Sequence, residues 1–210
     1  KQKLKFVVGN DTNVVFSGTR IVTKTDSNEF HKIELSGYVS SYYAHYSDEK
    51  ENGGFVQFPT MAPRNDQFGL NIAQIGMQYQ DQNFRGNITL HYGDIPESNW
   101  PKPFTLIQEA HAGFKIIKNL WLDAGFFKTH IGIESIQPRE NITSSMSVVN
   151  YYDPYFLSGA KLTYQVTPKL SLQANIFNGY NEYIENNKNK AIGFCLEWCS
   201  PYSLFKAGFI

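Results

Sequence analysis

The sequence predicts an all-β protein, an antiparallel up-and-down β-barrel of meander topology that crosses a membrane. Residues 120–127 alternate apolar with mixed side chains at a period of two, and residues 160–166 and 170–177 repeat the pattern. Long polar connections and tight turns follow one another in strict alternation, as they do in outer-membrane barrels. Aromatic residues make up 15% of the chain, which suits the aromatic girdles at two membrane interfaces.

The bulk composition excludes two classes of protein. The 210 residues carry 19 basic and 19 acidic side chains, so nothing in the net charge favours a nucleic-acid partner. No apolar run approaches the ~20 residues of a membrane helix, and the mean hydropathy is −0.38. A barrel is compatible with this low value because only every second residue of each strand faces lipid.

The chain is expected to hold one barrel domain, residues 31–210, after an N-terminal arm, residues 1–30. Within the arm, residues 4–8 and 14–16 are short β-like runs separated by turn residues, which predict either a hairpin or an irregular arm. The sequence therefore does not determine the secondary structure of the arm.

Eight strands are predicted in the barrel domain. The second, residues 68–79, changes phase near Ile72, which indicates a β-bulge. Tight turns should lie at the periplasmic end of these strands and long loops at the outer end. The predicted strands are residues 33–44, 68–79, 85–92, 109–116, 120–131, 158–166, 170–177 and 191–198.

A ninth strand is predicted to begin at Leu204, and it covers seven residues to Ile210. Seven residues are fewer than the ~9–11 that cross a membrane, and single-chain bacterial barrels have even strand numbers. The count therefore predicts an incomplete portion of a larger barrel, whose last strand pairs with the strand at Ala191 and leaves its other edge free. A closed eight-stranded barrel with a frayed tail is the alternative.

Five short segments in the middle of the chain carry a resemblance to a known family: Leu120 to Gly125, His130 to Glu134, Tyr155, Ser158 to Lys161, and Asn178-Gly179. In these residues the chain resembles the OmpL-like family of outer-membrane β-barrel porins of Gram-negative bacteria, and the resemblance extends over residues 33–210. The resemblance implies a single barrel domain and passive transport of small solutes. Where many members have Trp after Asn-Gly, this sequence has Tyr180.

The mixed face of the strands is expected to line the lumen, while Phe114, Leu122, Leu162, Leu172 and Phe194 face outward. Charges of both signs on the inner face could shape the field across a channel. The alternative is a plugged lumen held by salt bridges. The predicted pore-lining residues with charged or imidazole side chains are Arg85, His91, Glu109, His111, Lys115, Asp123, Lys161 and Glu197.

The loop from Gly132 to Asp153 is a candidate constriction loop, with Glu134, Arg139 and Glu140 as its charged residues. Folded into the lumen, it would narrow a pore; the alternative is a solvated surface loop.

His91 and His111 lie on adjacent predicted strands and could meet across the ladder. A metal site would need Glu109 as a third ligand, so two separate polar lumen residues are the favoured interpretation. Cys195 and Cys199, four residues apart, would lie too far apart on one strand for a disulfide.

These observations predict an outer-membrane porin that lets small solutes or ions diffuse passively through its lumen. Its partners are outer-membrane lipid and those solutes, and a homo-oligomer is left open. No catalytic or phosphate-binding motif is present, so no enzyme, cofactor or metal is expected. The alternatives are a non-conducting barrel with a structural or surface-binding role, a soluble ligand-binding β-barrel, and an outer-membrane lipid hydrolase.

Overall fold

The described residues form a single antiparallel sheet of eleven strands in sequence order. The computed structural model describes residues 5–8, 14–26, 29–46, 54–55, 61–141, 146–200 and 203–209. The elements are β1 (Lys5–Val8), β2 (Val14–Asp26), β3 (Glu29–Ala44), β4 (Gln67–Gln80), β5 (Phe84–Tyr92), α1 (Asp94–Asn99), β6 (Ile107–Ile117), β7 (Leu120–Lys128), η1 (Pro138–Glu140), α2 (Val148–Tyr152), β8 (Phe156–Thr167), β9 (Leu170–Phe177), β10 (Ala191–Ser200) and β11 (Ser203–Phe209).

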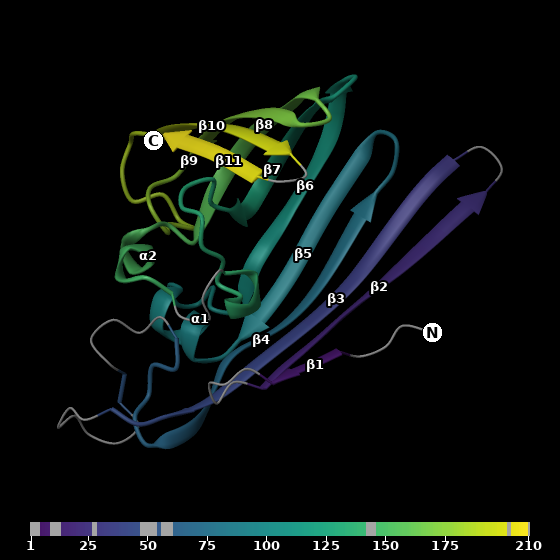
Figure 1. Cartoon of the computed structure of the whole chain (residues 1–210). Coiled ribbons are helices and arrows are strands. Elements are labelled where there is room, and N and C mark those ends of the chain that lie inside the picture. Colours follow the sequence, from purple (N-terminus) through teal and green to yellow (C-terminus); the bar gives the residue numbers. More distant parts are fainter. Residues whose placement is uncertain are drawn as a thin grey trace.

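The sheet curls from β2 and β3 on one side to β10 and β11 on the other (Figure 1). Within the described residues, β11 pairs only with β10, and β1 pairs only with β2. The edge strands therefore do not meet, which confirms the prediction that the strand at Leu204 pairs with the strand at Ala191 and leaves its other edge free. The all-β meander without closure agrees with an incomplete barrel.

The eight predicted strands are all present as β3 to β10, and the predicted partial ninth is β11. The strand predicted over residues 120–131 ends at Lys128, so its last three predicted residues belong to the following loop. The residues expected to form an arm contribute β1 and β2, and β2 pairs with β3 from Asp26 opposite Glu29 to Val14 opposite Ser41. The two β-like runs of the predicted arm thus form a hairpin, one of the two alternatives, which adds two strands to the predicted eight and partial ninth.

The predicted irregularity near Ile72 is present. The β3–β4 register shifts between Ser40 and Ser41, which pair with Ile72 and Leu70, so that Asn71 is the extra residue. The Asn71 side chain is buried, donates to Ser40 Oγ at 3.3 Å and accepts from the amide of Ala62 at 2.7 Å. A polar side chain at the bulge thereby joins the sheet to the loop that precedes β4.

The two faces of the sheet differ in chemistry. Phe114, Leu162, Leu172 and Phe194 are exposed and lie on the face opposite the polar positions of the same strands, while Leu122 is partly exposed. The opposite face carries buried polar residues such as Asn87, Asp123 and Asn175. Other exposed apolar side chains of β3 to β10 on the outward face are Ile33, Leu35, Val39, Ile75, Met77, Ile88, Leu90, Ile116, Tyr164, Ile176, Ile192 and Leu196.

The helices and the long connections gather at one end of the sheet, and the tight turns lie at the other (Figure 1). A hydrophobic cluster lies beneath these connections, with members from three long loops and from β3, β4 and β8. Its buried residues are Tyr38, Ile72, Ile95, Trp100, Ile136, Met146, Tyr155, Phe156 and Tyr183. No helix among the described residues is long and apolar enough to cross a membrane.

Candidate functional site

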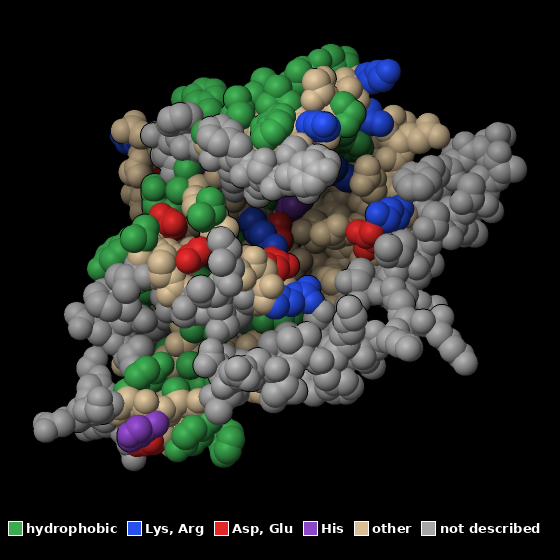
Figure 2. Space-filling view, viewed as in Figure 1, with side chains coloured by type: hydrophobic (Ala, Val, Ile, Leu, Met, Phe, Trp, Pro, Cys, Tyr) green, Lys and Arg blue, Asp and Glu red, His purple; other side chains and the backbone are tan. Residues whose placement is uncertain are grey.

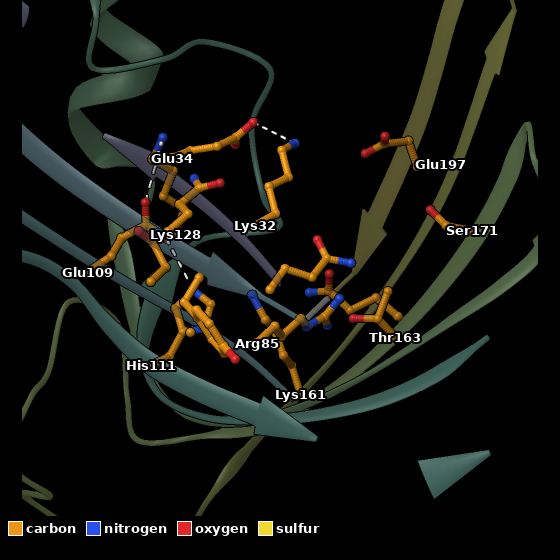
Figure 3. A pocket seen from close by; sticks show the side chains of 16 residues that line it. Lys32, Glu34, Arg85, Glu109, His111, Lys128, Lys161, Thr163, Ser171 and Glu197 are labelled. Atoms are coloured by element: carbon orange, nitrogen blue, oxygen red, sulfur yellow. Dashed lines mark ion pairs between the residues drawn. The ribbon is translucent and has the colours of Figure 1, made fainter. Parts of the chain in front are cut away.

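The inner face of the sheet forms a polar cavity of about 530 Å³ toward the tight-turn end. Figure 2 shows basic, acidic and histidine side chains gathered in this hollow, and Figure 3 shows them projecting from opposite walls. The cavity is lined by Lys32, Glu34, Gln78, Tyr79, Gln80, Arg85, Gly86, Asn87, Glu109, His111, Lys128, Lys161, Thr163, Ser171, Gln173 and Glu197.

Arg85 pairs with the buried carboxylate of Asp123 at the base of the cavity. Arg85 Nε donates to Asp123 Oδ1 at 2.6 Å, and its Nη2 donates to Oδ2. The Asp123 side chain is 0% exposed, and the guanidinium carbon lies 4.6 Å from the centroid of the Trp121 ring. A bidentate pair of this kind satisfies both carboxylate oxygens, so Asp123 is neutralised in place.

Glu109 of β6 is the second carboxylate near the base of the cavity. Its Oε2 lies 3.6 Å from His111 Nε2, and its Oε1 lies 3.7 Å from Lys128 Nζ. His111 also approaches Asp123, with 4.0 Å between Nδ1 and Oδ1. On the facing wall, Lys32 and Glu34 of β3 pair at 2.5 Å (Figure 3). The cavity therefore contains charges of both signs, most of them paired locally.

Lys161 lies opposite Asp123 in the β7–β8 register but makes no ion pair within the described residues. Its Nζ lies instead 4.7 Å from the centroid of the Phe127 ring. Both oxygens of the neighbouring Asp123 are occupied by Arg85. Lys161 is therefore a cation of the cavity without a carboxylate of its own.

The structure brings five of the eight predicted pore-lining residues to the cavity: Arg85, Glu109, His111, Lys161 and Glu197. Asp123 lies behind Arg85 in the wall. Lys115 does not line the cavity, because its ammonium bonds the carbonyl of Gln82 at the tight turn and lies 5.0 Å from the Trp121 ring.

His91 does not line the cavity either. Its side chain is 2% exposed and meets the Trp100 ring edge-on at 4.6 Å. His91 pairs with Gln74 in the β4–β5 register, whereas His111 pairs with Asn87 on β5. The two histidines are thus four residues apart along β5 and do not form a site together. No group of three or more metal-ligating side chains exists in the described ranges.

The loop between β7 and β8 reaches across the interior to β3 and β4. Gln137 Nε2 donates to Gln74 Oε1 at 2.5 Å, and Gln74 in turn donates to Gln108 at 2.5 Å. The guanidinium carbon of Arg139 lies 5.0 Å from the centroid of the Tyr38 ring. The candidate constriction loop therefore spans the lumen between walls that lie far apart in the sheet.

Glu134 and Glu140 brace this loop from within. Glu134 Oε2 accepts from the amide and the hydroxyl of Ser147 at 3.0 and 2.9 Å, and Glu140 Oε2 accepts from Ser135 Oγ at 2.7 Å. These carboxylates hold the loop conformation, whereas Arg139 reaches the Tyr38 ring of β3.

At the long-loop end of the lumen, aromatic residues of the loops pack against residues of the strands. Tyr183, from the β9–β10 connection, stacks on Phe156 with ring centroids 4.1 Å apart. Burial raises the pKa of the Tyr183 hydroxyl to about 12, so it stays protonated and donates to the carbonyl of Ile107. Phe126, which the alternation groups with outward residues, packs at 4.4 Å against the same ring.

Sequence reasoning missed three charged residues of the cavity. Lys32 and Glu34 belong to β3, but Lys32 precedes the predicted start at residue 33, and Glu34 was not singled out. Lys128 is the last residue of β7, where alternation no longer determines the direction of a side chain. The two cysteines form no disulfide, and Cys195 is buried while Cys199 is exposed.

Comparison with known proteins agrees with this architecture. Residues 32–209 match the family described as "Putative beta-barrel porin-2, OmpL-like". No curated protein and no solved structure matches the chain. The family match runs from Lys32 within β3 to the end of β11 and includes every charged residue that lines the cavity, so the chain belongs to this OmpL-like family of β-barrel porins.

Proposed function

We propose that this protein is an outer-membrane porin through which small solutes or ions diffuse passively. The observation that carries the proposal is the contrast between the two faces of one sheet. The outward face is apolar and exposed from β3 to β10, whereas the inward face encloses a charged cavity of about 530 Å³. A soluble ligand-binding barrel would leave that outward face in water, while a lipid bilayer covers it.

The loop between β7 and β8 would set the narrowest part of such a pore. Gln137 and Arg139 contact inward residues of β4 and β3, so the loop divides the long-loop end from the cavity. Lumen loops and charged walls are the elements that determine size and charge selectivity in channels. Membership of a porin family agrees with a transport role and with no enzymatic one.

A non-conducting barrel is the second candidate, and one observation favours it. The hydrophobic cluster beneath the long loops includes Trp100, Tyr155 and Phe156, all nearly fully buried. A cluster of this kind acts as a plug if it fills the cross-section of the lumen. Conductance separates a plug from a pore, whereas the fold is common to both.

The test is to refold the full chain into phospholipid vesicles and planar bilayers. We expect insertion with a β-type circular dichroism spectrum, discrete conductance steps in KCl, and vesicle swelling in small sugars that falls as sugar size rises. A folded, inserted protein without conductance at any voltage would establish the plugged barrel. A protein that stays monomeric without detergent and never inserts would establish the soluble barrel.

A further inference from the structure

We propose that the cavity holds a binding site for small anions, either chloride or the carboxylate group of a solute, centred on the ammonium of Lys161. This inference rests on the proposed function, since it names the ion class that the lumen would take. The argument begins from the pairing of charges along the cavity wall.

Three carboxylates of the cavity already have cations. Asp123 is held by Arg85, Glu109 lies 3.7 Å from Lys128, and Glu34 pairs with Lys32. Glu197 of β10 lies farther from Lys161, because it pairs with Ser171 of β9, whereas Lys161 pairs with Asn175, four residues along the same strand. Among the described residues, no carboxylate beside Lys161 is therefore left over to neutralise it.

Lys161 carries the remaining positive charge. In the corner formed by β5 to β8, the described charged residues are the cations Arg85, Lys128 and Lys161 and the carboxylates of Glu109 and Asp123, which leaves one positive charge when His111 is neutral. The ammonium is turned to the Phe127 ring at 4.7 Å. A partly desolvated cation without a fixed counter-charge attracts a mobile one from solution.

Side chains with neutral hydrogen-bond donors line the same cavity as this ammonium. Thr163 lies two residues along β8 and pairs with Gln173 of β9 in the register. Asn87 also lines the cavity, and its side-chain oxygen accepts from Thr89 Oγ1 at 3.3 Å. A cation with hydroxyl and amide donors is the environment that stabilises chloride or a carboxylate.

The first experiment needs no conductance. The line width of ³⁵Cl in NaCl is measured by NMR with the full chain refolded in detergent, for the wild type, Lys161→Gln, Lys161→Arg and Lys169→Gln. Lys169 is an exposed lysine of the β8–β9 turn and is the matched control. We expect excess broadening in the wild type, Lys161→Arg and Lys169→Gln, its loss in Lys161→Gln, and its displacement by sodium acetate.

The second experiment measures the reversal potential of the inserted channel in a KCl gradient. We expect the chloride-to-potassium permeability ratio to fall about fivefold in Lys161→Gln, the effect of one charge at ~4 Å in a water-like dielectric. Lys169→Gln should leave the ratio unchanged.

The outcomes separate this inference from the proposed function. Equal chloride broadening in the wild type and Lys161→Gln, or broadening that acetate leaves unchanged, would overturn the anion site whether or not the channel conducts. If Lys161→Gln does not fold, two other measurements test the anion site. Displacement of chloride by acetate in the wild type and retained broadening in Lys161→Arg would support the site, and the absence of either would overturn it. Chloride binding at Lys161 without any conductance would support the site and reject the porin.

Discussion

Arginine placed on either side of one strand tests the assignment of the inner and outer faces. Leu162 and Thr163 are neighbours near the middle of β8, which runs from Phe156 to Thr167. Leu162 is 38% exposed on the outward face, whereas Thr163 lines the cavity. We expect Leu162→Arg to lower the free energy of unfolding in lipid by ~2–4 kcal/mol, the cost of Arg near the midplane on the lipid side of a barrel.

Thr163→Arg should cost less than about 1 kcal/mol, because its guanidinium can remain in the wet cavity. The measurement is urea unfolding in phospholipid vesicles, followed by tryptophan fluorescence, with Leu162→Ala as the control for lost packing. Similar costs for the two arginine variants would refute the assignment of faces. A near-neutral Leu162→Arg in a protein that unfolds reversibly without lipid would show that the outward face meets water.

Three further predictions concern the lumen. Arg85→Leu should lower the free energy of unfolding by ~3–5 kcal/mol, since it leaves the buried Asp123 carboxylate without a counter-charge. The Arg85→Leu/Asp123→Leu double variant should recover much of this loss in the same urea unfolding titration. Replacing Gln137 and Arg139 together by Ala should raise single-channel conductance, and unchanged conductance would mean that the loop does not border the path. Tyr183→Phe should cost about 1 kcal/mol in denaturant unfolding, since it removes one hydrogen bond to the backbone of β6; no change would mean that water replaces the bond.

The strands could be predicted because their signal is local. Alternation at a period of two identifies a strand and its two faces from neighbouring residues alone, and β9 matches its predicted bounds of Leu170 and Phe177. Strand ends are less well determined. β7 stops at Lys128, although the predicted strand runs to Ile131, because the chain there leaves the ladder to begin the lumen-crossing loop.

The depth of a residue along the lumen could not be predicted in the same way. Alternation places His91, Lys115 and Lys161 on the inner face, but only Lys161 reaches the cavity. His91 lies at the end that Trp100 covers, and Lys115 lies beside the tight turn. The position along the strand decides these environments, and it depends on which loop folds over which strand.

Contacts between loops and walls are the least accessible to sequence reasoning. Gln137 and Gln74 are 63 residues apart, and Tyr183 and Ile107 are 76 apart. Neither pair has a local pattern that connects its members. Such contacts depend on how far the sheet curls, which in turn depends on the register of every strand between them.

The difference between the loop contacts on the two sides of the lumen indicates where a path for solutes would run. On one side, Trp100, Phe156 and Tyr183 bury their rings against one another, with Phe156 and Tyr183 stacked at an interplanar angle of 17°. Burying one such ring is worth ~1.5–3 kcal/mol or more, so separating the cluster is costly.

On the other side, Ile136 of the loop belongs to the same buried cluster as Tyr38 and Ile72 of the sheet. The loop is also joined to the sheet by two polar contacts, the Gln137–Gln74 hydrogen bond and Arg139 over the Tyr38 ring. Each such contact contributes only about 1 kcal/mol, and water can replace it. Gln74 also lies on the same face of β4 as Gln78, which lines the cavity. A shift of the loop at Gln137 would open a polar route along β4 into the cavity only if Ile136 also separated from the cluster, so a path for solutes on this side would need both changes.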